Sequence, residues 1–150
     1  TIKISGNPTH ETLNLKLRYP YWATYMKVNG RKVKAGKDGY VAIKVVKRAE
    51  IEFGMSLREE ATKDDPSRVA LMYGPVVLGG RLAEVEHPFS DPTKYNDYYT
   101  FDYGQHHDVS YHSLNDFRQI SPLRFNGPED IEVLPFFDLH HHRYVVYWKK

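Results

Sequence analysis

The sequence predicts an all-β, antiparallel fold: a β-sandwich of the jelly-roll or immunoglobulin-like kind, with a long irregular segment rich in Tyr and His. Three observations indicate this class. Short apolar runs are separated by turn residues, several runs alternate with a period of two, and no stretch of useful length has the helical period. Strands that bury one face alternate in this way, and several such strands at regular spacing favour a sandwich or a barrel.

The clearest strands lie in the first half of the chain. Residues 12–19 alternate apolar and polar side chains up to Pro20, which cannot donate a ladder hydrogen bond. Residues 26–33 are expected to form a hairpin, because Asn29-Gly30 accepts the positive φ values of a tight turn.

The rest of the chain contains further strand signals and one charged stretch. Strands are predicted at 40–45, 51–53, 69–73, 76–80, 131–133 and 143–148. Residues 58–68 are charged and are typical of a loop. The Gly74-Pro75 break lies between two continuous apolar runs, which predicts strands buried on both faces with a kink or bulge between them.

Residues 87–119 differ in composition from the rest, with few aliphatic side chains and many Tyr, His and Asp. A stretch of this length without periodicity is typical of a functional loop or of an irregular segment packed by its own aromatic rings. The length of 150 residues suits one domain, 1–150. The change in composition predicts a sub-boundary near 80–88, between first sandwich strands (1–80) and a C-terminal extension (81–150).

Composition excludes several classes of function. The absence of Cys excludes a disulfide scaffold, a thiolate zinc site and a cysteine nucleophile. The first 75 residues contain 14 Lys and Arg against 8 Asp and Glu, and the second 75 contain 7 against 11, so no dominant basic field favours nucleic acid. No run approaches about 18 apolar residues and no signal-peptide pattern opens the chain, so we expect no membrane partner. The compartment stays open.

A series of short motifs occurs in an order typical of one family. The motifs are Leu17-Arg18-Tyr19-Pro20-Tyr21-Trp22-Ala23, Val28-Asn29-Gly30, Gly39-Tyr40, Met55-Ser56-Leu57-Arg58, residues 69–78, residues 89–99 and residues 140–148. With them the chain resembles the β-sandwich region of bacterial glycoside hydrolase family 127, whose characterised activity is that of a β-L-arabinofuranosidase.

The resemblance implies a division of labour between domains. In that family an (α/α)-barrel of several hundred residues precedes the sandwich and contains a zinc-bound cysteine nucleophile, further Cys ligands and a Glu acid/base. This chain has no Cys, so the resemblance implies no catalytic residue and no cofactor here, with zinc only in the barrel. It implies an accessory domain that packs on the barrel of a periplasmic or secreted enzyme acting on arabinose-containing glycans.

The chain also departs from the family pattern. Only five residues stand between Val45 and Ile51, where a longer turn containing Trp is expected. The stretch 104–125 is abbreviated as well. These departures affect the expected loop geometry and leave the expected sandwich unchanged.

Three consecutive histidines suggest a metal site. Alternate residues of a strand share a face, so His140 and His142 are weak candidates for two imidazole ligands, with Asp138 as a third ligand on the same face. The set is incomplete for a catalytic zinc, which needs three protein ligands. The alternative, which we favour, is that these histidines hydrogen-bond the irregular segment and orient Arg143.

Carboxylates in the irregular segment raise the question of a self-contained glycosidase site, which needs two carboxyl groups. The candidates are Asp91, Asp97, Asp102 and Asp108. Acidic residues in such loops are more often turn formers or caps. We therefore expect no active site within this chain, and a stand-alone enzyme is the least favoured of three functional hypotheses.

The other two hypotheses are an accessory domain that packs on the barrel and a carbohydrate-binding module, and they assign different roles to a Tyr-rich cluster. Its candidate contact residues are Tyr95, Asn96, Asp97, Tyr98 and Tyr99, with Arg143 from the closing strand. Tyr rings stack on the apolar faces of sugars, as in a carbohydrate-binding module, but Tyr also buries a large area at domain interfaces. We favour an interface with the catalytic barrel, with a glycan as the alternative partner.

Overall fold

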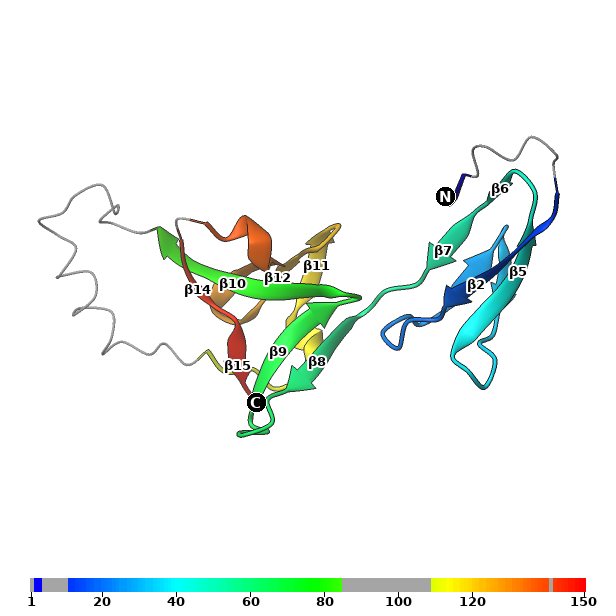
Figure 1. Ribbon diagram of the computed structural model, residues 1–150. Coiled ribbons are helices and arrows are strands. Elements are labelled where there is room, and N and C mark those ends of the chain that lie inside the picture. The colour runs from blue at the N-terminus through cyan, green and yellow to red at the C-terminus, as the bar shows by residue number, and fades with distance from the viewer. Residues whose placement is uncertain (1, 4–10, 85–108, 141) are drawn as a thin grey trace, which may run out of the picture. The chain divides into compact units, whose positions relative to one another are not determined.

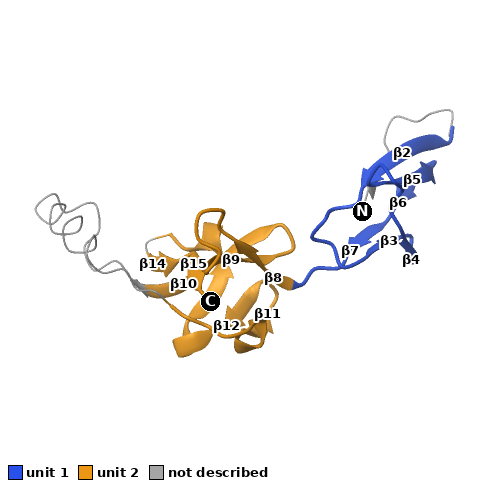
Figure 2. Cartoon of the chain, turned by 90° about the horizontal axis from the view of Figure 1, so that it is seen from below, with its two compact units in different colours: residues 1–56 blue, residues 57–150 orange. Residues whose placement is uncertain are grey.

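The chain divides into two compact units, residues 1–56 and residues 57–150, shown in two colours in Figure 2. The computed structural model describes residues 2–3, 11–84, 109–140 and 142–150. Within these ranges every pairing between strands is antiparallel, and an isolated bridge between Ser110 and Lys149 is parallel. The only helical elements in the same ranges are three single turns of 3-10 helix (Figure 1). The all-β antiparallel class is confirmed, and the fold is consistent with a sandwich.

Unit 1 comprises the first 56 residues, and those of them that the structure describes contain seven short strands in three small sheets. The strands are β1 (Ile2–Lys3), β2 (Leu13–Arg18), β3 (Met26–Val28), β4 (Arg31–Val33), β5 (Tyr40–Val45), β6 (Arg48–Ala49) and β7 (Ile51–Phe53). The sheets have the orders β1-β6, β2-β5 and β4-β3-β7. The strands predicted at 12–19, 40–45 and 51–53 are confirmed within a residue or two.

The predicted Asn29-Gly30 hairpin is also confirmed. Both residues have left-handed backbone angles, with φ 48° at Asn29 and 78° at Gly30, and they join β3 to β4. The side-chain oxygen of Asn29 accepts a hydrogen bond from the Glu50 N–H at 2.9 Å. The turn residue therefore also ties the hairpin to the chain that leads into β7.

The core of unit 1 is small. Its buried apolar side chains are Met26, Val41, Val45 and Ala49, which come from β3, β5 and β6. Trp22 and Phe53 add an edge-to-face contact with ring centroids 5.7 Å apart. A unit of this size buries a low fraction of its surface and is only marginally stable by itself.

Unit 2, residues 57–150, is built on one eight-stranded sheet. Its strands are β8 (Leu57–Ala61), β9 (Arg68–Tyr73), β10 (Val76–Glu84), β11 (Arg118–Ser121), β12 (Arg124–Asn126), β13 (Glu132–Pro135), β14 (His142–Val145) and β15 (Tyr147–Lys149). The 3-10 turns are η1 (Leu114–Asp116), η2 (Pro128–Asp130) and η3 (Phe136–Asp138).

Strand β10 is the centre of this sheet. It pairs with β13 through Leu78–Arg81, with β9 through Val76–Leu78 and with β14 through residues 80–84. Strand β15 follows β14 directly and pairs with the first half of β9. Figure 1 shows the result, in which β14 runs beside the end of β10 and β15 beside β9, so the sheet curls around its inner face.

The inner face of the curled sheet holds the main core of unit 2. Eleven buried residues form one cluster: Val69, Leu71, Leu78, Val109, Tyr111, Phe117, Phe125, Ile131, Val133, Val145 and Trp148. Phe117 packs edge-to-face on both Tyr111 and Trp148, with centroids 5.2 Å apart in each pair. These side chains come from strands far apart in sequence, so the core holds the whole unit together.

Two adjacent glycines let groups approach β10 closely from both faces. A Cβ atom at Gly80 would lie 2.8 Å from both Ile131 Cγ2 and Trp148 Cζ2 in the inner core. A Cβ at Gly79 would lie 2.5 Å from Leu139 Cδ1, which follows η3 on the opposite face. Side chains cannot occupy those positions without displacing the neighbours.

The expectation of a loop at 58–68 is wrong for its first part, because residues 57–61 form β8. Strand β8 pairs with β9 along its full length. Its charged residues are held at the sheet edge, where Arg58 donates to the Gly74 carbonyl at 3.1 Å and Glu59 pairs with Lys150 at 2.5 Å. Charged side chains are common on edge strands, where they oppose further pairing. Only residues 62–67 connect β8 to β9.

Two other expectations are corrected. Gly74-Pro75 is a tight hairpin turn, since Tyr73 is directly opposite Val76, and no kink or bulge joins collinear strands there. The predicted closing strand 143–148 consists of β14 and β15, which pair with different partners and are separated at Val146.

The two units meet between Ser56 and Leu57, whereas the sequence predicts a sub-boundary near residues 80–88. Residues 80–84 lie inside β10, which pairs on both sides. Residues 85–88 lie outside the described ranges.

Candidate functional site

Most of the sequence-predicted site residues lie outside the described residues. These are Tyr95, Asn96, Asp97, Tyr98 and Tyr99, together with Asp91, Asp102 and Asp108. The interface and sugar hypotheses for this segment therefore stay predictions.

The predicted histidines and arginine lie at the start of β14. His140 is exposed and precedes the strand by two residues, so the strand period does not place it beside His142. His142 is half-buried, opposite Glu84 of β10. Arg143 alternates with the exposed Tyr144 and is half-buried. Among residues 2–3, 11–84, 109–140 and 142–150, no three His, Asp or Glu side chains gather in a way that would hold a metal ion.

A row of polar and aromatic residues crosses the outer face of the unit 2 sheet. Consecutive members are directly opposite one another on neighbouring strands, from β14 through β10, β13 and β12 to β11. The members are Tyr144, Arg81, Glu132, Asn126 and Arg118. We call this set the outer row. Neighbouring strands lie about 4.8 Å apart, so it spans about 19 Å.

Alternation along each strand explains why these residues face outward. Their chain neighbours Gly80, Val133, Phe125 and Val145 are all buried, and the last three belong to the inner core. Successive residues of a strand point to opposite faces, so burial of one set on the core directs the outer row to the other face. The inner core therefore determines the orientation of the site.

The centre of the outer row is a charged triad. The carboxylate of Glu132, with its side chain 24% exposed, pairs through one oxygen with Arg81 at 2.5 Å and through the other with Arg124 at 2.6 Å. Arg124 lies on β12 two residues before Asn126, so both share the outward face. Beyond the triad, the Asn126 side-chain amide donates to Asp130 at 3.2 Å.

The β14 end of the row is an aromatic platform formed by Tyr144 and Phe136. Their rings meet edge-to-face with centroids 5.3 Å apart, and both side chains are more than 40% exposed. Phe136 begins η3, and Leu139 at the end of that turn packs over Gly79. The absence of a Cβ at Gly79 thus allows η3 to lie against the sheet and brings Phe136 to Tyr144.

The groups on this face can donate and accept several hydrogen bonds at once. Each guanidinium has five N–H donors, and the ion pairs with Glu132 engage one nitrogen of Arg81 and one of Arg124. The Asn126 side chain offers both a donor and an acceptor. The carboxylate of Glu132 adds an acceptor between the two guanidinium groups.

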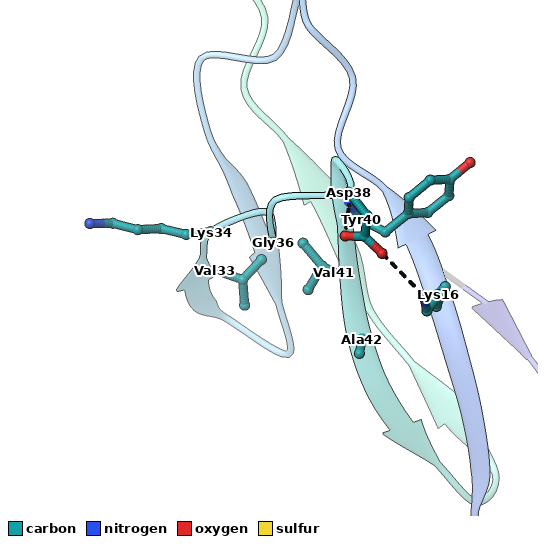
Figure 3. A pocket seen from close by; sticks show the side chains of 8 residues that line it. All are labelled: Lys16, Val33, Lys34, Gly36, Asp38, Tyr40, Val41 and Ala42. Carbon is teal, nitrogen blue, oxygen red and sulfur yellow. Dashed lines mark hydrogen bonds and ion pairs between the residues drawn. The ribbon is translucent and has the colours of Figure 1, made fainter.

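Unit 1 contains a hollow. Its volume is about 470 Å³, and it is lined by Lys16, Val33, Lys34, Gly36, Asp38, Tyr40, Val41 and Ala42. In Figure 3 the side chains of Lys34 and Tyr40 point away from the pair Val33 and Val41. Lys16 is paired with Asp38 at 3.0 Å, which with the Tyr40 N–H holds the pKa of Asp38 below its usual value. The hollow thus offers few convergent polar groups.

A second polar cluster in unit 1 is internally satisfied. Glu52 on β7 accepts hydrogen bonds from the Tyr25 hydroxyl at 2.6 Å and from Lys27 at 2.9 Å, and these lower the pKa of Glu52. The Lys27 ammonium also lies 4.9 Å from the centre of the Tyr25 ring. The cluster joins β3 to β7 and resembles a structural support more than a binding site.

Sequence reasoning missed the outer row, apart from Arg143 beside it. The alternation of Ile131, Glu132 and Val133 was a usable signal that Glu132 faces outward. The pairing of Arg81 with Glu132 depends on the register of strands about 50 residues apart, and no local pattern in a single sequence contains that information.

Comparisons with known proteins show a distant similarity to solved structures. No protein-family model matches the chain. No curated protein matches it either. Among solved structures, the chain is similar to a GH127 β-L-arabinofuranosidase from Geobacillus stearothermophilus T6, with 17% sequence identity and a TM-score of 0.46. That similarity covers 93% of this chain and 26% of the enzyme, so the chain spans about a quarter of its length.

No helix in the described residues is long and apolar enough to cross a membrane.

Proposed function

We propose that the chain is a non-catalytic accessory β-domain of a glycoside hydrolase that acts on arabinose-containing glycans, and that it packs on and supports the catalytic (α/α)-barrel of that enzyme. The observation that supports this most directly is where the family-like motifs fall. Leu17-Arg18-Tyr19-Pro20 ends β2, Val28-Asn29-Gly30 makes the β3–β4 turn, and residues 69–78 make the β9–β10 hairpin. The motifs thus coincide with strand ends and turns, the positions that define an antiparallel fold.

Exposed aromatic side chains on unit 2 support a partner. Outside the outer row and its aromatic platform, Phe137 is 61% exposed and Tyr147 is 53% exposed. Aromatic residues are enriched where proteins meet other proteins.

The first test is the reading frame together with the isolated chain. We expect the frame to encode several hundred further residues of a helical barrel with Cys ligands ahead of Thr1. The purified chain is expected not to hydrolyse aryl β-L-arabinofuranosides and to bind the separately expressed barrel. A frame without such a region, or turnover by the pure chain, would contradict the proposal.

A Phe137→Ser variant makes the binding assay specific. Because Phe137 is exposed, the substitution should leave the thermal midpoint nearly unchanged while weakening association with the barrel. Ile120→Ser, at an exposed position on β11, is the matched control. Equal binding by both variants and the parent chain would remove Phe137 from the proposed interface.

A further inference from the structure

We infer that the outer row, together with Phe136 and Arg124, binds an uncharged oligosaccharide chain. The inference rests on the proposed function for the choice of sugar, since arabinose-containing glycans are polymers of this kind. It assigns the recognition of the glycan to residues on the β14–β10–β13–β12–β11 face, and these residues differ from the Tyr-rich cluster that the sequence suggests.

The arrangement of donors and acceptors supports a polyhydroxylated ligand. Sugar hydroxyls both donate and accept hydrogen bonds. Along the row, the guanidinium groups of Arg81 and Arg118 donate, Glu132 accepts, and Asn126 does both. The five members follow one another at strand spacing, so they present these groups along a line of about 19 Å, which suits an extended chain.

The aromatic platform provides the apolar part of the recognition. Sugar rings have faces made of C–H groups, and exposed Tyr and Phe rings offer matching apolar surface. Tyr144 is 48% exposed and is held by Phe136, which is itself fixed through η3 and Leu139 on Gly79. A ring that is already held in place loses little conformational entropy when a ligand binds.

The charge balance of the face favours an uncharged ligand over a polyanion or a protein. Glu132 lies between Arg81 and Arg124, and Asp130 lies beyond Asn126, so the positive charges of the row are largely offset within it. A surface for a polyanion needs an excess of cations. The cores of protein interfaces are depleted of charged residues, whereas here a charged triad occupies the centre.

The experiment measures binding of a linear arabino-oligosaccharide to the 150-residue chain by calorimetry and by NMR titration. We expect weak but saturable binding. Arg81→Ala and Tyr144→Ala should each weaken it about tenfold or more, the size expected for loss of a hydrogen bond from a charged group or of an aromatic contact. Tyr144→Phe should bind nearly as well as the parent, because it keeps the ring.

Matched controls separate this site from others. Tyr147→Ala, at an equally exposed position on β15 outside the row, should leave sugar binding unchanged. Circular dichroism of each variant checks that unit 2 is folded. For Arg81→Ala, the conservative variant Arg81→Lys should recover part of the affinity, since it restores a donor.

Three outcomes would overturn the inference. They are no binding at millimolar sugar, binding that Arg81→Ala and Tyr144→Ala do not weaken, and preferential binding of an oligogalacturonide, which is a polyanion. If these substitutions weaken association with the barrel and no sugar binds, the face is a protein interface and the inference is wrong, although the proposed function stands. If sugar binds through the row but the reading frame contains no barrel, the proposed function fails and the site remains.

Discussion

The two units of the chain are both antiparallel, but they are stabilised to different degrees. Among the described residues, unit 1 buries four apolar side chains and unit 2 buries fourteen. Unit 1 consists of small sheets of two or three strands, whereas unit 2 has one eight-stranded sheet around a continuous cluster. Burial of apolar surface is the main favourable term in folding, so we expect unit 2 to be the more stable unit.

The difference also concerns what each unit can present to a ligand. The core of unit 2 packs against one face of its sheet and fixes the register of the strands. The residues on the opposite face are therefore aligned as well, and they form the outer row. The polar groups of unit 1 are instead used to join its short strands, as in the Glu52 cluster. A rigid support is what a recognition surface requires.

The largest expected effect comes from removing the centre of the unit 2 core. Trp148 is fully buried. Together with Ile131 it fills the space above Gly80. Trp148→Ala should destabilise unit 2 by about 3–5 kcal/mol, the usual cost of truncating a buried aromatic residue. The chain has two Trp residues, so the remaining Trp22 reports on unit 1 alone. Urea unfolding followed by circular dichroism and by Trp22 fluorescence measures both units.

Tyr147→Ala is the matched control, since the adjacent side chain is exposed and should change stability by no more than about 0.5 kcal/mol. The comparison between units predicts that the Trp22 transition keeps its midpoint in Trp148→Ala. A Trp22 transition that moves together with the circular dichroism signal would show that the two units unfold as one, against the separate cores described above.

A smaller effect is expected at two glycines, one in each unit, for different reasons. Gly80→Ala places a methyl group against Ile131 and Trp148 and should destabilise unit 2 by about 1–3 kcal/mol through overpacking. Gly30→Ala meets no atom within 4 Å, but its φ of 78° should cost about 1 kcal/mol in unit 1. Thermal unfolding of both variants compares them.

A double variant sharpens this contrast. In an Ile131→Ala background, which lacks the Cγ2 methyl that is among the nearest atoms to a Gly80 Cβ, Gly80→Ala should cost less stability than it does in the parent chain, whereas no core substitution should rescue Gly30→Ala. An unchanged cost of Gly80→Ala in that background would mean that close approach to Ile131 is not what requires Gly80.

The two units also differ in how much of their structure could be predicted from the sequence. The strands of unit 1 can be predicted from local sequence, because the alternation in residues 13–18 and the Asn29-Gly30 turn are short-range signals. The all-β class follows from the same signals along the whole chain. Strand β8 was missed because its charges resemble those of a loop, and only its pairing with β9 shows that it is an edge strand.

The candidate site could not be predicted because it depends on register between distant strands. Glu132 meets Arg81 and Arg124 only once β10, β13 and β12 are aligned, and shifting any pair by one residue would turn its side chains to the opposite face. The triplet of histidines attracted attention as a motif, yet β14 begins only at His142. The local composition therefore suggested metal ligands at His140, a position that the strand pairing of β14 does not reach.

The smallest expected effect is electrostatic and again differs between the units. Partial burial acts to raise the pKa of Glu59, but the hydrogen bond and the charge of Lys150 oppose it, and the pKa lies below its usual value. In unit 1 the pKa of the more exposed Glu52 is lowered by hydrogen bonds from Tyr25 and Lys27. A carboxyl group with a lowered pKa in the folded state stabilises the fold above its unfolded pKa of about 4.5, and this contribution is lost as the pH falls through the lowered value.

Glu59→Gln should therefore lower the urea midpoint of unit 2 at about pH 7 and have little effect at about pH 3. Glu52→Gln should change unit 1 by less, because solvent screens an exposed pair. An equal deficit for Glu59→Gln at both pH values would assign its effect to packing and not to the charge on Glu59.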